Sequence, residues 1–492
     1  MGSKGRTRHN TSLKIVPTMA ALLLLGSLLL CREIIHPETL SVRQALCLVG
    51  IIATIGCAIS VVILLYVSRT IDFFLIFILL SYLFSFGQSF AVLLNLDAGF
   101  DGLLYLGNGN FSSSTIFYSA LSVLQMITSF VIGYVLFYER KCEKVACLKE
   151  GNKRLLKCGR ALIIINIIPS FYLAVKDLVN VLNSSYANSR ENLTKIDSIL
   201  TLFSSLFYSG LIMSIIGETN KRRKRLVYLL MTCYFIIELL GGSRFDLFRF
   251  GVMFVIIVID RHKKIRIKDI LKTVALVCFF GLILSVVSSS RQSSIKNIND
   301  LVLAITTSIE EGGVVGKVFF ETGITQLFNA VVFENCPQNI DFCYGASLYK
   351  IVLGCIPNLG FWNVHPTGIT TEVVFSPLYA NFGLGSSLWS EFYWNFGLVG
   401  ACVILVLFGV IVSRISHKHR VALRSDNKII LFIIYYLIYY FSISIRSDMT
   451  QIGRDLVYYA VLPLLISKLF RKKTTFAKQI SFLHNNNVIM EE

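Results

Sequence analysis

Long apolar runs separated by short polar loops dominate this 492-residue chain. A helix needs about twenty residues to cross roughly 30 Å of hydrocarbon. The pattern therefore predicts about twelve membrane-spanning helices, at 15–31, 45–66, 71–96, 114–138, 161–181, 196–217, 227–241, 245–260, 270–290, 388–413, 429–445 and 455–470. The runs at 227–241 and 245–260 are short and closely joined, so eleven spans, or ten with a re-entrant hairpin, are alternatives.

Lys and Arg residues alternate between heavy and light loops, as the positive-inside rule expects of such spans. The light loops include 97–113, which has no Lys or Arg, and 291–395, which has four. The heavy loops are the N-terminal segment, 140–160, 221–225, 261–268, 414–428 and the tail after 468. The alternation predicts that both termini are cytoplasmic and that the light loops lie outside.

Residues 291–395 interrupt the apolar pattern with mixed polar and aromatic sequence and hold four of the eight prolines. We expect this segment to form one large extracytoplasmic loop. The organisation predicted for the whole chain is a membrane domain of nine spans, the loop, three further spans and a cytoplasmic tail, with boundaries at 1–290, 291–395, 396–470 and 471–492.

Composition agrees with an all-α polytopic membrane protein, because 54% of the residues are hydrophobic and 15% are charged. The net charge of +18 sits in the loops between spans, which argues against nucleic-acid binding. The twelve cysteines lack C-x-x-C spacing, so neither a zinc site nor a disulfide framework is expected. Cys336, Cys343 and Cys355 fall in the outer loop, where a bridge, most simply Cys336 to Cys343, and free thiols are both open.

Four arginines lie at the outer ends of predicted spans, where topology does not require positive charge. Arg244 lies in a Gly-Gly-Ser-Arg turn, Arg291 follows the ninth span, Arg446 ends the eleventh and Arg454 opens the twelfth. A guanidinium group suits phosphate because its planar fork donates two parallel hydrogen bonds and stays charged. The alternative for each is contact with lipid headgroups.

The outer loop offers three candidates for acid–base work. An amphipathic helix predicted over 313–335 has a polar stripe of Lys317, Glu321, Thr325 and Asn329. The stripe could line a sugar site or face solvent, and a solvated face is favoured for Lys317 and Asn329, whereas Glu321 could act as a base or hold a sugar hydroxyl. His365 precedes a proline in a turn-rich segment and titrates near neutrality, although an ordinary surface histidine is equally consistent.

Glu391 is the third candidate and the preferred base. If Ser387 caps the helix that follows, Glu391 lies one turn inside it, where the helix dipole favours the anion. A carboxylate there could act as base, bind a hydroxyl or orient an arginine. The sequence contains no nucleotide-binding glycine loop, HExxH helix or GxSxG elbow. No outer Asp/Glu cluster offers a metal site, so neither metal nor cofactor is expected.

The second half of the chain, roughly 225–470, resembles the bacterial O-antigen polymerase (Wzy-type) or oligosaccharide repeat-unit polymerase family. The resemblance is carried by the Gly-Gly-Ser-Arg turn at 241–244, by Arg291 and Arg446 at span ends, and by a Gly-x-Gly-Ser-Ser, Glu and Asn-Phe-Gly pattern over 383–400. The first half is similar only in being apolar.

The resemblance implies a GT-C-like membrane glycosyltransferase that polymerises undecaprenyl pyrophosphate-linked oligosaccharides into O-antigen or capsule-type polysaccharide. The reaction would take place on the outer face of the bacterial cytoplasmic (inner) membrane, without a metal, with membrane lipid, a chain-length regulator and a flippase as partners. An O-antigen ligase shares the architecture but uses another acceptor. A polysaccharide flippase or other transporter should bury polar residues in several spans and usually lacks so large an outer loop.

Overall fold

The computed structural model describes residues 4–96, 111–139, 153–183, 195–240, 257, 313–356, 368–379, 384–425 and 427–470. Every regular element in this part of the chain is helical, which confirms the predicted all-α class. Six helices contain a segment long and apolar enough to cross a membrane: α1 (Lys4–Ile34), α2 (Val42–Ser68), α3 (Phe73–Leu93), α4 (Ser113–Phe137), α5 (Lys153–Asn183) and α16 (Leu388–Ser425). These six coincide with predicted spans.

The other predicted spans differ in outcome. α7 (Lys195–Gly217) and α17 (Lys428–Ile443) contain shorter apolar segments, and α8 (Lys221–Leu240) covers the run that begins at 227 as far as Leu240. The runs at 245–260 and 270–290 lie outside the described residues, apart from Ile257.

The predicted span at 455–470 is not one continuous α-helix. It consists of α18 (Ile452–Leu456), the π-helical turn η5 (Val457–Val461), α19 (Leu462–Ser467) and the 3₁₀ turn η6 (Lys468–Phe470). Pro463 explains part of this irregularity, because it has no backbone N–H to donate to the preceding turn.

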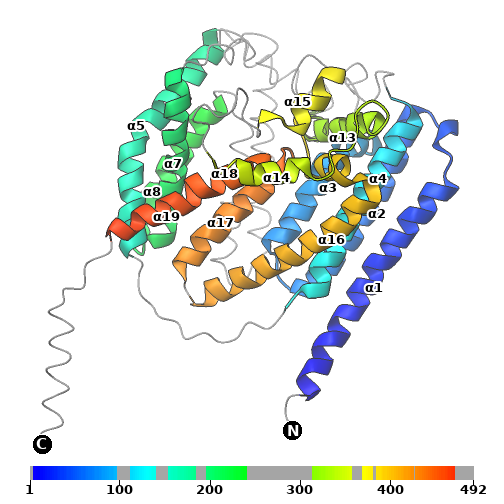
Figure 1. Ribbon diagram of the computed structural model, residues 1–492, viewed down its shortest axis with the longest axis horizontal. Helices are drawn as coiled ribbons and strands as arrows, with labels where there is room; N and C mark the ends of the chain where they lie inside the picture. The colour runs from blue at the N-terminus through cyan, green and yellow to red at the C-terminus, as the bar shows by residue number, and fades with distance from the viewer. Residues whose placement is uncertain are drawn as a thin grey trace, which may run out of the picture.

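The long helices form two groups, and α17 and α19 connect them (Figure 1). α1 to α4 pack together with α16, while α5, α7 and α8 form a second group. α17 and α19 contact the second group and lie between the two in Figure 1. The main core is apolar and rich in aromatic rings, such as the stacked pair Phe74 and Tyr134.

Glycines allow α4 and α16 to cross at very short range. A Cβ atom on Gly133 would lie 1.9 Å from the Val406 carbonyl oxygen, and one on Gly409 would lie 2.4 Å from that of Phe130. Small residues at such crossings let helices pack closely in lipid, where no hydrophobic force drives them together.

Several basic loops share one end of the bundle, the lower end in Figure 1. The contacts at this end are Lys14 Nζ to the Leu136 carbonyl (3.1 Å), Arg154 Nε to the Ser467 carbonyl (2.8 Å) and Arg420 to the Glu139 carbonyl (2.6 Å). Basic residues from three of the heavy loops, Lys14, Arg154 and Arg420, therefore lie at this end, and the side of the membrane that it faces stays a prediction. α13 (Ile324–Asn335), α14 (Ala346–Leu353) and α15 (Thr371–Phe375) lie at the other end of α16 (Figure 1).

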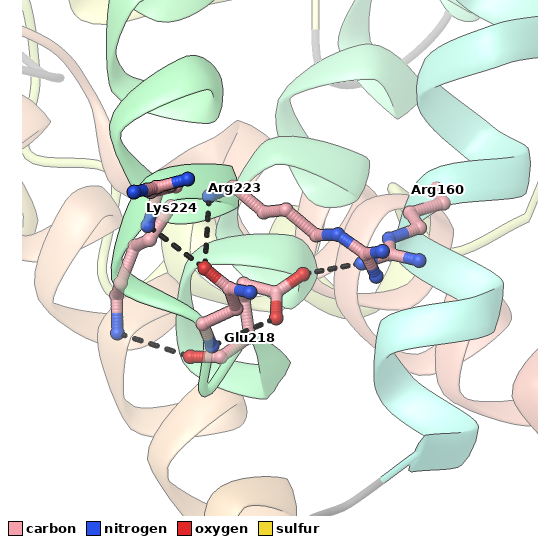
Figure 2. A network of polar contacts seen from close by, with 6 residues as sticks. Arg160, Glu218, Arg223 and Lys224 are labelled. Carbon is pink, nitrogen blue, oxygen red and sulfur yellow. Dashed lines mark hydrogen bonds and ion pairs between the residues drawn. The ribbon is translucent and has the colours of Figure 1, made fainter.

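Glu218 organises the basic end of the second group (Figure 2). This buried carboxylate forms an ion pair with Arg160 of α5 and accepts the Asn220 backbone N–H at 3.0 Å. The Asn220 side chain in turn accepts the N–H of Arg222 at 2.9 Å and so caps the start of α8. The network fixes the turn between α7 and α8 against α5.

The helix predicted over 313–335 is divided. α12 (Gly313–Thr322) and α13 meet at Gly323, where the segment crosses α3. A Cβ atom on Gly323 would lie 2.4 Å from the backbone nitrogen of Gln88, and one on Gly87 would lie 2.3 Å from the Phe319 carbonyl oxygen. This part of the expected outer loop therefore packs into the helical bundle, where Thr325 and Asn329 of its polar stripe are buried.

Candidate functional site

Four segments converge at the N-terminal end of α16. They are the first turns of α16, the turn 444–449 that links α17 to η4 (Met449–Gln451), α14, and α15 with its flanking residues. Figure 1 shows α14 crossing above α16 and α17 and α15 near α13. Buried polar side chains gather at this junction.

Ser387 caps α16, as the sequence predicts. Its hydroxyl accepts the Ser390 N–H at 3.0 Å, and its carbonyl accepts the Glu391 N–H at 3.0 Å. The hydroxyls of Ser387 and Ser390 both donate to the side-chain oxygen of Asn329 in α13, each at 2.6 Å. Asn329 is therefore buried, and the prediction of a solvated face at this position is wrong, because α13 packs against α16 rather than facing water.

The long helix α16 breaks at Gly397, shortly after Glu391. Gly397 has φ 62° and ψ −177°, a backbone region that only glycine adopts readily, so Leu388 to Phe396 form a short helical segment of their own. A Cβ atom on Gly397 would also lie 3.4 Å from the Phe342 ring. The break sets the direction of the Glu391 segment independently of the long helix that follows.

Glu391 is fully buried and held by two hydrogen bonds. Oε1 accepts the Ser347 hydroxyl of α14 at 2.7 Å, and Oε2 accepts the Met449 backbone N–H at 2.8 Å. Asn395, one turn further along, donates to the Ser347 hydroxyl oxygen at 2.7 Å. Within the described residues neither carboxylate oxygen pairs with an arginine.

Asp448 is a second buried carboxylate beside Glu391. Oδ2 accepts the Thr371 N–H at 2.8 Å, while Oδ1 accepts the hydroxyls of Thr371 and Ser386. Burial raises the pKa of the Asp448 carboxyl above its ordinary value; the hydrogen bonds from Ser386 and Thr371 act against this rise, and the negative charge of Glu372 adds to it. Asp448 thereby fastens both α15 and the segment before α16 to the turn after α17.

Arg446 and Gly385 lie together although they are far apart in sequence. The Ser386 N–H donates to the Arg446 carbonyl at 3.4 Å, and the Leu388 N–H donates to the Ser444 carbonyl at 2.7 Å. Gly385 has φ +80°, and a Cβ atom there would lie 3.6 Å from Arg446 Nε. The glycine-rich stretch before α16 therefore passes directly beside the arginine side chain.

A family model described as "O-antigen polysaccharide polymerase Wzy" matches residues 19–479. The chain belongs to this family. It is a membrane polysaccharide polymerase that joins lipid-linked repeat units. Searches of curated proteins and of solved structures found no match.

Arg454 of the polymerase lies on α18, close to the same junction. Its Nε pairs with Asp455 Oδ1 at 2.8 Å. α18 packs on α14 at Gly453, where a Cβ atom would lie 2.0 Å from the Ile351 carbonyl oxygen. The described part of the polymerase thus brings Glu391, Arg446 and the Arg454 helix to one place.

The other predicted site residues either lie outside the described part of the chain or belong to another helix. Arg244, Arg291 and His365 lie outside them. Glu321 lies near the end of α12, a helix that packs on α3. Cys336, Cys343 and Cys355 are free thiols, which answers the question left open by their spacing. Cys343 donates instead to the Asn395 side chain at 3.0 Å.

Sequence reasoning missed several members of the site. Asp448 was visible only as a neighbour of Arg446 after an apolar span, and that position was the one available signal. Ser347, Thr371 and Lys350 carry no local signal, because their importance depends on contacts with residues far away in the chain.

Proposed function

We propose that the polymerase transfers a growing glycan from undecaprenyl pyrophosphate onto a new lipid-linked repeat unit at the outer face of the bacterial cytoplasmic membrane. The observation that carries this proposal is the buried Glu391 carboxylate, held by Ser347 and Met449 one turn inside α16 and close to Arg446. The family indicates the substrate class, and the buried Glu391 carboxylate and the Arg446 guanidinium are the groups that we propose as base and cation.

The reaction is a substitution at the anomeric carbon of the donor glycan. A hydroxyl of the acceptor sugar forms the new C–O bond while the bond to the pyrophosphate oxygen breaks, and the leaving group keeps the electron pair. The hydroxyl proton passes to a base. The two requirements are therefore a proton acceptor on one side of the sugar and positive charge around the pyrophosphate.

Glu391 is our first choice for the base. Its two hydrogen bonds fix the carboxylate, and an ionised carboxylate has about four acceptor positions, so capacity remains for a sugar hydroxyl. A positioned base typically contributes about 10² to 10⁴ in rate. Glu321 and His365 are the second candidates for assisting deprotonation.

Arg446 is the best supported ligand for the pyrophosphate, because its backbone is fixed to the segment before α16. Arg244, Arg291 and Arg454 complete the proposed site. Preorganised donors aimed at a developing charge are typically worth about 10² to 10³ each in rate. A guanidinium performs this role without a metal ion.

The proposed topology has about twelve spans in a GT-C-like arrangement, with both termini cytoplasmic and 291–395 outside. It is supported by the six helices that match predicted spans and by the basic contacts gathered at the end of the bundle opposite α14 and α15. We propose that a flippase delivers the repeat units to this outer face and that a chain-length regulator acts on the product.

The lipid-linked glycans that accumulate when the gene is removed test this function. Single repeat units on the outer face are the expected result. Units trapped on the inner face would indicate a flippase instead. Long polymers that remain unattached to their final acceptor would indicate an O-antigen ligase.

A further inference from the structure

A closed ring of contacts surrounds the space between Glu391 and Asp448. Glu391 accepts the Ser347 hydroxyl, and Lys350 lies one turn after Ser347 on the same helix. Lys350 Nζ donates to the Ile369 carbonyl at 3.2 Å, and Thr371, two residues later, donates to Asp448. Met449 follows Asp448 in the chain, and its backbone N–H donates to Glu391, which closes the ring.

Lys350 is the cation of this ring. It is 9% exposed, and it is the one lysine that is buried among the residues whose side chains the structure describes. An ammonium group has three N–H donors, and the Ile369 carbonyl occupies one of them. Because burying an ammonium group is costly, a lysine in such a place requires compensating negative charge.

The charges that face this lysine come from every element around it. Its positive charge acts on the Glu391 carboxylate and on the Cys343 thiol. Two buried carboxylates repel each other, and Glu391 and Asp448 interact in this sense. The titratable and charged groups around the ring in the described chain are Cys343 before α14, Glu372 of α15, Glu391 of α16, Arg446 and Asp448 of the turn, and Arg454 and Asp455 of α18.

We propose that Lys350 is a positioning residue: its buried positive charge favours the ionised form of Glu391, and its contact with the Ile369 carbonyl keeps α14 and Ser347 in place against Glu391 for proton abstraction. The proposal rests on the proposed role of Glu391 as base. Within the described residues Lys350 makes no direct ion pair with either carboxylate, so it acts through space and through α14.

The variant Lys350→Met removes the charge and keeps an unbranched side chain. With purified polymerase and lipid-linked repeat unit, we expect its rate to fall at neutral pH and to recover at higher pH. The acid side of its pH–rate profile should move to higher pH, as expected when a nearby opposite charge is removed. Lys350→Arg should keep a profile close to wild type. The control is Lys418→Met, an exposed position at the basic end of α16, which should change neither rate nor profile.

Two results would overturn the proposal. An unchanged profile in Lys350→Met would show that the charge is not needed. A loss of rate that is equal at every pH would show that Lys350 only anchors the Ile369 carbonyl. Glu391→Gln, measured in parallel, separates the two levels of inference. If Glu391→Gln retains full activity, the proposed base is wrong. If it is inactive while Lys350→Met behaves as wild type, only the role of Lys350 fails.

Discussion

The Met449 backbone N–H donates to Glu391 Oε2 over 2.8 Å, which joins the turn after α17 directly to the start of α16. The neighbouring side chain, Asp448, binds Thr371 of α15 and Ser386. Two successive residues thus hold the candidate base, α15 and the glycine-rich segment in one arrangement. A displacement of this turn would affect all of them together, because each depends on the same short stretch of backbone.

Arg446→Ala should abolish polymer formation while protein abundance in the membrane stays near normal. The reason is that the arginine side chain lies beside Gly385 at the junction, where the pyrophosphate is proposed to bind. Arg446→Lys should restore little activity, because lysine lacks the bidentate fork. Polymer length in cells that carry each variant is the measurement.

The matched control for Arg446→Ala is Arg414→Ala, an exposed arginine on the basic part of α16. This variant should make polymer of normal length. Full-length polymer in Arg446→Ala would exclude the arginine from the pyrophosphate site.

Gly397→Ala should lower the stability of the protein and shorten or abolish the polymer. A Cβ atom at φ 62° and ψ −177° is strained, at a cost of about 1 to 3 kcal/mol. Relief of this strain would turn the Glu391 segment away from Ser347 and Met449. Thermal unfolding in detergent tests the prediction, with Gly26→Ala as a control, since nothing lies within 4 Å of a Cβ atom there. Equal unfolding temperatures for both variants would contradict it.

Gly133→Leu should sharply reduce the amount of folded protein. Its side chain would collide with the Val406 carbonyl and force α4 and α16 apart. Gly26→Leu places the same residue on an open surface of α1 and should be tolerated. Membrane abundance and size-exclusion behaviour of the two variants measure the difference. Normal behaviour of Gly133→Leu would show that the two helices do not cross at this point.

The topology can be tested with single cysteines in a variant that lacks the twelve native ones. Glu38 and Lys418 are exposed. Glu38 follows Pro37, which contacts Ser113 at the start of α4, whereas Lys418 lies in the part of α16 that contacts Glu139 after the end of α4, so the two positions are at opposite ends of the bundle. A membrane-impermeant thiol reagent should label Glu38→Cys in cells with a permeabilised outer membrane, and Lys418→Cys only after the inner membrane is broken. Labelling of Lys418→Cys alone in unbroken cells would reverse the orientation.

Much of the fold could be predicted from the sequence, because membrane spans are long and depend on a single property. The runs that begin near 15, 45, 71, 114, 161 and 388 all correspond to candidate spans. The run at 455–470 is helical throughout but irregular, and hydropathy does not register the π-helical turn that precedes Pro463. The amphipathic helix at 313–335 was placed correctly, but its break at Gly323 depends on a close crossing with Gly87 that no local pattern shows.

The candidate site was predictable only where local rules apply. Ser387 was recognisable as a cap because serine before an apolar helix accepts a backbone N–H, and this gave Glu391 its correct place. The partners of Glu391 were not recognisable, because Ser347 and Met449 meet it through tertiary contacts. Asn329 was misjudged for the same reason, since a polar residue on a helix face does not reveal whether water or another helix covers it.

The polymerisation rate of purified Glu391→Gln on lipid-linked repeat unit tests the proposed chemistry most directly. Gln keeps one acceptor oxygen for Ser347 or Met449, so the variant should fold, with an unfolding temperature near wild type. Its rate should fall by about 10²-fold or more, the contribution expected of a positioned base, and the acid-side dependence of the wild-type rate on pH should disappear. Glu38→Gln, at an exposed position, should behave as wild type. A near-normal rate in Glu391→Gln would contradict its role as the base.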